Sequence, residues 1–470
     1  MRKLFIPLLS LVLMAVLTSC VSGASVADQA TPTPVPAESI PVTTLSPTIT
    51  NTTLSGGVLS TRTYDLTNND QISFGSLSNS AETIVARLPY TGGTLRIYHP
   101  TNGWTTLKDP ASGDYRGTLF ILDSTGRSVL AYPPQRWKAL QNHSRQFLSY
   151  GFLRISGNEL QLIAPATNGM TTADYTLAVS SAPLIDWSHP NSESLWSGYT
   201  NSGSGRWCYD GYYWPAPSTY VPSGNNVYYR MVDAYLCRSF LYAASVHRAA
   251  EDLVLCMLDV MADQQNSFGF FPTLPGSTWL SGDYGIGNGF YDTRFNTDLI
   301  EMFRKGWETY HIERFQLVLN RYFTFYQTYA ETHHRATKHN GWLIDDYYNP
   351  TGGRRTHTSL NHQLAEILLL YQASDTLAAP ALADLADQLL LAIEDTARHW
   401  IRSDHNLHYG IYADGSYGGI DYPYLTYNDL FALQCELEAR GHGRSAVLDQ
   451  LMASKKVWMD ATGVTDYRKK

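Results

Sequence analysis

The chain has 470 residues, with 42 acidic and 34 basic side chains and a formal net charge of -8 at pH 7. It carries no basic stripe, which excludes nucleic acid as the expected partner. So long a chain exceeds one ordinary hydrophobic core, and we therefore expect more than one domain.

The N-terminus predicts export. Arg2 and Lys3 precede the apolar run "LFIPLLSLVLMAV", and "LTSC" ends at Cys20. A positive start, a short apolar core and small residues before a cleavage point are typical of a signal peptide rather than a membrane span. The Leu-Thr-Ser-Cys ending resembles the lipobox of bacterial lipoproteins. This resemblance implies a signal over residues 1–20, lipidation of Cys20 and an extracytoplasmic protein anchored to a membrane; a plain signal peptide is the alternative.

Two segments with different compositions follow. Residues 21–52 are rich in Thr, Pro, Ser and Ala and almost uncharged, which predicts a disordered linker. Residues 53–185 contain short β-branched segments such as "GTLRIYHP" and "DYTLAVSS", separated by turn residues. They predict an antiparallel β-sandwich with a supporting or binding role.

Residues 186–470 change to a helical period from about residue 225. Four helical hairpins can be laid over one another, with Leu236, Leu299, Leu364 and Leu430 at corresponding positions 63 to 66 residues apart. Repeated hairpins are typical of an array whose units bury faces against each other. The long loops before each first helix favour an α/α toroid over a solenoid. We therefore predict a multidomain β + α fold, an N-terminal antiparallel β-sandwich followed by an α/α toroid of helical hairpins.

Aromatic, acidic and basic side chains concentrate in the loops before the first helices, and in a toroid these loops meet at one cleft. Aromatic rings stack on pyranose faces, and arginine binds a carboxylate in bidentate fashion. The composition therefore predicts an acidic polysaccharide as partner, with no cofactor and no metal. The candidate substrate-binding residues are Tyr229, Trp279, Tyr284, Asp292, Trp342, Asp345, Asp346 and Arg355.

Two motifs resemble the C-terminal α/α domain of the D-glucuronyl C5-epimerases. "GFYDTR" contains that family's Tyr-Asp-x-Arg motif, and "HTSLNHQLAEILLLY" is similar to its His-Thr-Thr-His-x-Asn-Gln-Leu stretch. The matching residues are Tyr291, Asp292, Arg294, His357, Thr358, Gln363 and Leu364. Leu360 and His362 depart from the family pattern, and the two motifs lie a full repeat apart instead of close together.

The resemblance implies epimerisation of a uronate by proton removal and return at C5. It implies Tyr291 as one acid/base group and Tyr348 or Tyr424 as the other, with Arg294 neutralising the carboxylate and His357 orienting or sharing the proton. A polysaccharide lyase shares the first step, so the two outcomes stay open.

Other interpretations stay open at this point. Asp292 can be a helix N-cap, and Arg294 can pair with Asp298 one turn later. A glycoside hydrolase would pair Asp345 or Asp346 with Asp292 or Asp414. A glycan-binding surface protein would hold sugar without changing it.

Overall fold

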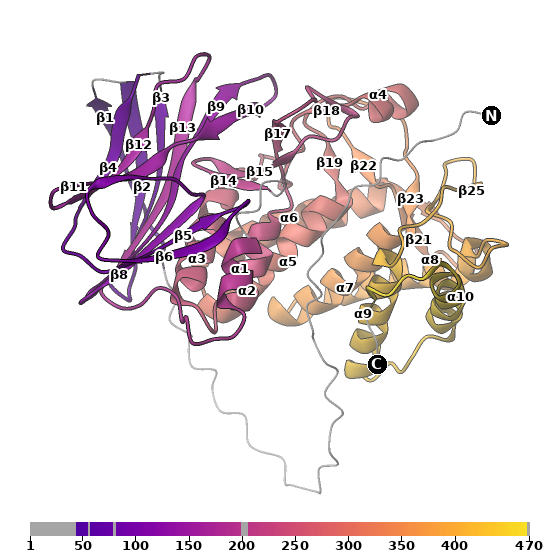
Figure 1. The fold of residues 1–470 in the computed structure, drawn as a ribbon. Coiled ribbons are helices and arrows are strands. Elements are labelled where there is room, and N and C mark those ends of the chain that lie inside the picture. The colour runs from indigo at the N-terminus through magenta and orange to yellow at the C-terminus, as the bar shows by residue number, and fades with distance from the viewer. Residues whose placement is uncertain (1–43, 55–56, 79–80, 199–204, 468–470) are drawn as a thin grey trace, which may run out of the picture.

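The computed structural model describes residues 44–54, 57–78, 81–198 and 205–467. Figure 1 shows a β-rich part in indigo and purple beside a helical part in orange and yellow. The predicted signal with Cys20, and the linker up to residue 43, lie outside the described residues. No helix in the described ranges is both long and apolar enough to cross a membrane.

Two antiparallel sheets make up the β-rich part. The larger sheet consists of β1 (Thr48–Leu54), β2 (Gly57–Asp65), β3 (Gln71–Ser78), β5 (Thr94–His99), β6 (Gly103–Lys108), β8 (Leu119–Ser124), β9 (Arg127–Ala139), β10 (Ser144–Tyr150), β13 (Thr172–Ser180), β14 (Arg206–Cys208), β15 (Gly211–Pro215) and β17 (Val227–Arg230). The smaller consists of β4 (Thr83–Pro89), β7 (Gly113–Tyr115), β11 (Phe152–Ser156) and β12 (Glu159–Ala164). Apolar residues of both sheets, including Leu77, Phe120 and Leu162, share one core between them.

Both predicted boundaries of this β part need correction. Strand β1 begins at Thr48, so the last residues of the predicted disordered linker form the edge of the larger sheet, paired with β2. The Thr-rich composition that predicted disorder also suits a strand, because β-branched residues favour the extended backbone. At the other end, β10 pairs with β17 and β17 with β15. The sheet therefore continues to Arg230, beyond the predicted boundary at residue 185.

Four helical hairpins follow, as the repeat predicted. Their first helices are α2 (Tyr235–Ala243), α5 (Thr293–Tyr310), α7 (Leu360–Thr376) and α9 (Leu425–Ala439), and their second helices are α3 (Arg248–Ala262), α6 (Glu313–Thr332), α8 (Pro380–Thr396) and α10 (Ala446–Thr462). The four corresponding leucines each lie buried on a first helix. Packing joins α2 to α5, α5 to α7 and α7 to α9 in turn. The hairpins therefore form an arc of four units.

Shorter elements cap this arc. Helices α1 (Ser192–Gly198), α4 (Thr278–Tyr284) and the 3-10 helix η1 (Ala397–Trp400) lie in its loops. The short strands are β16 (Tyr220–Val221), β18 (Gly276–Ser277), β19 (Tyr291–Asp292), β20 (His334–Ala336), β21 (Trp342–Ile344), β22 (Tyr347–Tyr348), β23 (Thr358–Ser359), β24 (Gly410–Ile411) and β25 (Tyr417–Gly418). Most of those labelled in Figure 1 lie toward its top, at the end where the first helices begin.

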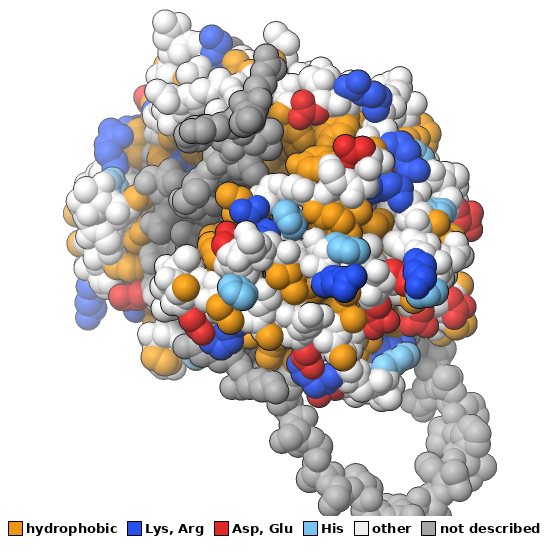
Figure 2. Space-filling model, turned by 90° about the vertical axis from the view of Figure 1, so that its right-hand side faces the viewer, with side chains coloured by type: hydrophobic (Ala, Val, Ile, Leu, Met, Phe, Trp, Pro, Cys, Tyr) orange, Lys and Arg blue, Asp and Glu red, His pale blue; other side chains and the backbone are white. Residues whose placement is uncertain are grey.

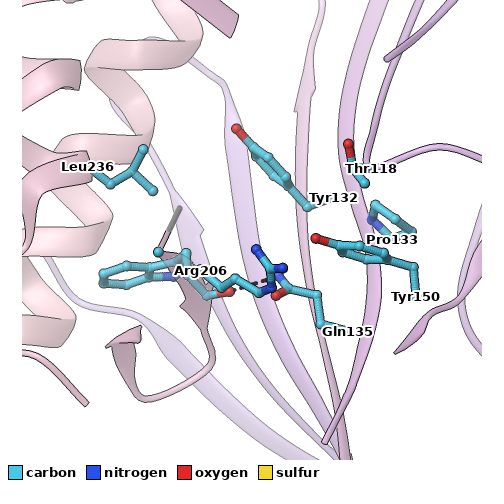
Figure 3. A pocket seen from close by; sticks show the side chains of 9 residues that line it. Thr118, Tyr132, Pro133, Gln135, Tyr150, Arg206 and Leu236 are labelled. Carbon is cyan, nitrogen blue, oxygen red and sulfur yellow. Dashed lines mark hydrogen bonds between the residues drawn. The ribbon is translucent and has the colours of Figure 1, made fainter. Parts of the chain in front are cut away.

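The sandwich is fixed to the helices by polar contacts with α3. The Tyr64 hydroxyl donates to Asp259 at 2.7 Å, and Arg62 donates to Asp263 at 2.8 Å. Between the larger sheet and α2 lies a cavity of about 20 Å³, which has room for about one water molecule. Its lining includes Tyr132, Gln135, Arg206 and Leu236 (Figure 3). The sandwich is thus one packed body with the helices in this structure.

A chain of charges ties the four first helices together. Arg238 on α2 lies 3.2 Å from Asp233 and 3.4 Å from Asp298 on α5. Arg294 donates to Asp298 at 2.9 Å, to Asp429 on α9 at 2.7 Å and to the Asn361 carbonyl of α7 at 3.0 Å. The alternative pairing of Arg294 with Asp298 is therefore confirmed. Its predicted role as the cation for a substrate carboxylate is not supported, because two aspartates and a carbonyl already occupy the guanidinium.

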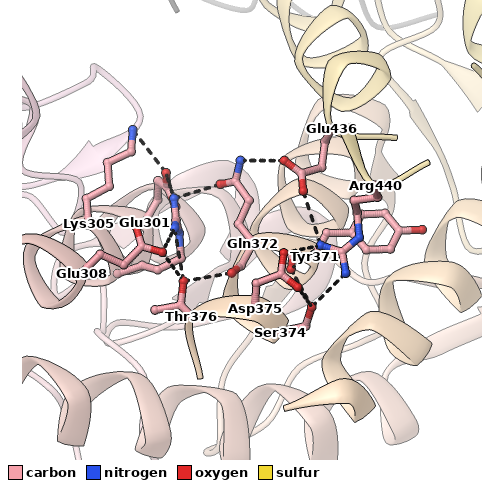
Figure 4. Close-up of polar contacts among 11 residues, drawn as sticks. Glu301, Lys305, Glu308, Tyr371, Gln372, Ser374, Asp375, Thr376, Glu436 and Arg440 are labelled. Atoms are coloured by element: carbon pink, nitrogen blue, oxygen red, sulfur yellow. Dashed lines mark hydrogen bonds and ion pairs between the residues drawn. The ribbon is translucent and has the colours of Figure 1, made fainter. Parts of the chain in front are cut away.

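The opposite ends of the same helices carry a second polar network, shown in Figure 4. Arg304 on α5 donates to Glu301, Glu308 and the Gln372 amide oxygen of α7. Gln372 in turn donates to Glu436 of α9 at 3.2 Å. Polar contacts thus hold the first helices in register at both ends.

We expect Arg294→Met to lower the free energy of unfolding by about 3–5 kcal/mol, because it removes the cation that Asp298 on α5 and Asp429 on α9 share. Urea denaturation followed by circular dichroism measures the loss. Lys456→Met is the matched control, since it removes an exposed pair with Asp460 on α10 and should cost much less stability. Equal losses of unfolding free energy in the two variants would contradict the role of Arg294 in joining the helices.

Candidate functional site

Short strand pairings bring the loops before the first helices together. Strand β19 pairs with β22, setting Asp292 opposite Tyr347, and β23 pairs with β24, setting Ser359 opposite Gly410. Strand β16 pairs with β18, which joins Tyr220 to the loop that precedes α4. Segments more than fifty residues apart thus meet where α5, α7 and α9 begin.

Asp346 is the centre of this meeting point and is 1% exposed. Its carboxylate accepts from the Ser359 backbone N–H at 2.8 Å and from the Ser359 hydroxyl. His362 Nδ1 lies 3.6 Å from Asp346 Oδ2. Burial opposes ionisation, but His362, His357 and Ser359 together lower the pKa of Asp346 below its ordinary value. Asp346 is therefore a buried carboxylate that keeps its charge.

His357 links Asp346 to the half-buried phenol of Tyr284. The Tyr284 hydroxyl and His357 Nδ1 form a hydrogen bond of 2.8 Å. His357 Nε2 lies 3.2 Å from Asp346 Oδ2, although it is not aligned as a regular hydrogen bond. Tyr284 is the last residue of α4, so this short helix sets the position of its hydroxyl. The three residues form a Tyr–His–Asp chain that runs from a partly exposed phenol to a buried carboxylate.

Asp292 caps α5 from the same region. Its carboxylate accepts from the Phe295 N–H at 3.0 Å, which confirms the N-cap interpretation. Burial raises the pKa of Asp292 to about 7, and the charge of Asp346 contributes to this increase. Two neighbouring carboxyl groups thus have pKa values displaced in opposite directions, one upward and one downward.

Aromatic rings surround His357. The ring centroids of Trp279, Tyr284, Tyr409 and Tyr412 lie between 5.7 and 6.1 Å from that of His357, and Tyr347 lies at 5.8 Å. We call these five rings with His357 the aromatic cluster. The sequence predicted Trp279, Tyr284 and His357, and it did not single out Tyr347, Tyr409, Tyr412 or His362. Tyr409 and Tyr412 lie in a tyrosine-rich loop over residues 405–424, and this composition is the sequence signal for them.

Tyr291, the predicted acid/base group, lies elsewhere. Its side chain is 0% exposed, and its hydroxyl hydrogen-bonds to that of Tyr322 at 2.9 Å. Phe270, Phe325 and Tyr329 pack around its ring. Burial raises the pKa of Tyr291 well above its ordinary value. We therefore correct its role to that of a core residue, because no substrate can reach the phenol.

Four of the remaining predicted site residues make their contacts outside the aromatic cluster: Asp345, Arg355, Tyr348 and Trp342. Asp345 accepts from Arg355 at 2.9 Å, and burial raises the pKa of Asp345 to about 6. Tyr348 packs against His333 at 4.6 Å, and Trp342 stacks on His334 at 4.1 Å. These contacts lie outside the aromatic cluster.

Tyr229 and Tyr424 are the last two predicted site residues, and neither belongs to the Tyr–His–Asp chain. Tyr229 is buried and packs on Tyr220 at 4.9 Å, which makes it a support for the β16 loop. Tyr424 is the N-cap residue of α9, and burial followed by the charge of Asp466 raises its pKa. Tyr424 therefore lies at the end of α9 that faces the candidate site.

The side chains of the aromatic cluster pack closely, and two hollows in the described residues lie elsewhere. One is the small cavity of Figure 3, and the other, of about 270 Å³, lies at the far ends of α2 and α5. Figure 2 shows one outer face of the molecule, turned from Figure 1, on which charges of both signs and histidines are interspersed. Within the described ranges, no group of three or more His, Cys, Asp or Glu side chains is placed to hold a metal ion.

No protein-family model and no curated protein matches the sequence. Among solved structures, the chain is similar to a family 76 glycoside hydrolase from a bovine Bacteroides thetaiotaomicron strain. The two are 12% identical, the match covers 87% of this chain and 78% of that chain, and the TM-score is 0.39. It is similar to the unsaturated glucuronyl hydrolase of Bacillus sp. GL1, with 13% identity, 49% and 60% covered, and a TM-score of 0.34. A D-mannose isomerase gives 13% identity, 49% and 59% covered, and a TM-score of 0.36. The chain spans 58 to 62% of the length of other solved structures that it matches. Similarities of this extent say nothing about the activity of this chain.

Asp292→Asn should make the stability of the protein less dependent on pH. The folded-state pKa of Asp292 is about 7, above its unfolded value, so its protonated form stabilises the fold at low pH and this contribution is lost as pH rises from about 4 to about 7. Asparagine keeps the N-cap acceptor but does not titrate. We expect the wild type to lose ~2–4 kcal/mol more than the variant across this interval, measured by urea denaturation. If the free energy of unfolding changes equally with pH in both proteins, the raised pKa of Asp292 is contradicted.

Proposed function

We propose that this protein is a carbohydrate-active enzyme that removes a proton from a uronate unit of an acidic polysaccharide. The observation that carries the proposal is the hydrogen bond of 2.8 Å between the Tyr284 hydroxyl and His357 Nδ1, with Asp346 behind the imidazole. The Tyr–His–Asp chain has the groups that acid/base catalysis needs, in the required order. They are a reacting hydroxyl, a proton acceptor and a fixed carboxylate that orients the proton acceptor.

The proton movements follow from this order. When Tyr284 donates to His357 Nδ1, the ring proton is on Nε2, the nitrogen that faces Asp346. As the phenol oxygen takes the proton from C5, its own proton passes to Nδ1 and leaves an imidazolium. The Asp346 carboxylate, whose charge is retained in the interior, stabilises that cation. The phenol thereby acts as a base although burial raises the pKa of Tyr284 above its ordinary value.

Substrate binding is assigned to the exposed sides of the same loops. Trp279, Tyr409 and Tyr412 offer ring faces for pyranose stacking, and all three are partly exposed. Arg354 is exposed and donates to the Asp283 carbonyl at 2.6 Å, next to Tyr284. Arg354 therefore replaces Arg294 as the proposed partner of the uronate carboxylate, since Arg294 is already occupied.

Two outcomes of proton removal fit this geometry. Return of a proton to the opposite face gives a C5 epimer, and expulsion of the 4-linked sugar gives an unsaturated product. Both need the same first step, so the proposed class is uronate epimerase or polysaccharide lyase.

Hydrolysis is the second candidate, supported by the carboxyl pair Asp292 and Asp346. The pKa of Asp292 is about 7 and that of Asp346 is lowered, so near neutral pH one carboxyl holds a proton and the other is ionised, as an acid and a base must be. Both carboxyls are buried and already accept protein hydrogen bonds, which ranks hydrolysis below the tyrosine mechanism. Glycan binding without catalysis is the alternative outside enzymes.

The proposed place of action is outside the cytoplasm, on a membrane to which a lipid on Cys20 anchors the protein. The N-terminal sequence that supports it is the apolar run ending in Leu-Thr-Ser-Cys.

Incubation with a panel of acidic polysaccharides in deuterated water separates these candidates. Deuterium at C5 without chain cleavage identifies an epimerase, and absorbance from a new double bond identifies a lyase. New reducing ends without unsaturation identify a hydrolase. We expect one of the first two, because the phenol is the most accessible group of the Tyr–His–Asp chain. Binding without any chemical change would support the glycan-binding alternative.

Tyr284→Phe should lower turnover roughly 10²–10⁴-fold, because it removes the group that takes the proton. Tyr291→Phe is the matched control: it removes a buried hydroxyl of the same type at a cost of about 1 kcal/mol of stability, with turnover preserved. Initial rates on the substrate found in the panel, with circular dichroism as a check of folding, measure both effects. Full activity in Tyr284→Phe, or loss of activity only in Tyr291→Phe, would overturn the assignment.

A further inference from the structure

The larger hollow lies at the ends of α2 and α5 that are far from the aromatic cluster. It has a volume of about 270 Å³ and is lined by Leu241, Tyr242, Ala244, Ser245, Glu251, Lys305, Thr309 and Tyr310. Helix α2 ends at Ala243, helix α5 ends at Tyr310, and Glu251 lies in the first turn of α3. Three helices thus contribute to one concave site that the proposed reaction does not use.

The lining is part apolar and part aromatic. Leu241 and Ala244 present aliphatic groups, and Tyr242 and Tyr310 present phenol rings. Tyr242 is 39% exposed, and the Lys305 ammonium lies 5.0 Å from the centre of its ring. Such walls bury the apolar body of a small ligand, and aromatic faces also attract a cation.

The two charged side chains of the lining differ in their partners. Lys305 Nζ donates to the Tyr242 hydroxyl at 3.0 Å and lies 3.3 Å from Glu301, an ion pair drawn in Figure 4. Glu251 forms no hydrogen bond and no ion pair through its carboxylate with any residue in the described ranges. The neighbouring Arg248 is engaged with Asp70 and with the Asn68 carbonyl. Apart from the longer-range attraction of Arg248, whose guanidinium is bonded to Asp70, the carboxylate of Glu251 has no cationic partner in direct contact among the described residues.

Further features of the site favour a positive ligand. Burial raises the pKa of Glu251, and burial followed by the charge of Glu251 raises the pKa of Tyr310 to about 12, which indicates that phenol and carboxylate are near each other. The C-terminal ends of α2 and α5 add the partial negative charge of their free carbonyl groups. A partly buried carboxylate is stabilised by an ion that also donates hydrogen bonds.

We propose that this hollow binds a small primary amine with a compact apolar body, whose ammonium group pairs with Glu251 between the rings of Tyr242 and Tyr310. The volume is below the ~300 Å³ at which pockets for drug-sized ligands begin, so the ligand is smaller than these. The site is independent of the proposed reaction at the other end of the helices.

Isothermal titration calorimetry of the full chain with phenethylamine tests the proposal. We expect one site per chain, with 2-phenylethanol and 3-phenylpropionate binding at least tenfold more weakly, because they lack the ammonium group. Glu251→Gln should weaken phenethylamine binding at least tenfold. Glu313→Gln is the matched control, since it changes an exposed glutamate in the first turn of α6, and it should bind as the wild type does.

A second variant keeps the test decisive if Glu251→Gln does not fold. Thr309→Trp fills the hollow from an exposed position on α5 and should abolish binding without removing the carboxylate. Absence of phenethylamine binding to the wild type, equal binding of the alcohol or the carboxylate, or retained binding in either variant would overturn the proposal. None of these results depends on whether the chain acts on a polysaccharide.

Discussion

The buried guanidinium of Arg294 holds the helical arc together. It bonds within α5 to Asp298, across to Asp429 on α9 and to a backbone carbonyl of α7, while Asp298 extends the chain to Arg238 on α2. A charge in this position is costly unless every partner is in place, so the contact stabilises one relative arrangement of the helices. That arrangement determines where the loops before the helices meet.

The candidate site depends on the same arrangement. Its residues come from loops that begin different helices, and short strand pairings fix their register. Asp346 is ionised in the interior because Ser359 and two histidines surround it, whereas Asp292, with its cap bond from the Phe295 N–H, has a raised pKa. Burial acts on both carboxyls, and the partners supplied by α5 and α7 decide which one keeps its proton. The proposed proton relay through His357 needs this difference in charge.

The two ends of the helical arc have different chemistry. Where the first helices begin, aromatic rings pack around His357, and the Asp346 carboxylate has hydrogen-bond partners. Where α2 and α5 end, a hollow remains whose Glu251 carboxylate makes no direct ion pair with any described residue. The sandwich does not act as a separate module in this structure, because its larger sheet continues into the segment that carries Tyr220 and Tyr229 and its Tyr64 bonds to α3. Loop positions at the candidate site therefore depend on the sandwich as well as on the helices.

The sequence by itself determined features that depend on neighbours in the chain: the change from strand to helix period, the four hairpins with buried Leu236, Leu299, Leu364 and Leu430, the N-cap at Asp292 and the pairing of Arg294 with Asp298. Each of these follows from backbone preference or from contacts within one turn. Only the tertiary structure decided that Tyr291 faces the core and that Arg294 meets Asp429, 135 residues away. It also decided that Tyr284, His357 and Asp346 form one chain. Burial and long-range charge pairing arise from the packing of whole hairpins, and local sequence preferences do not contain that information.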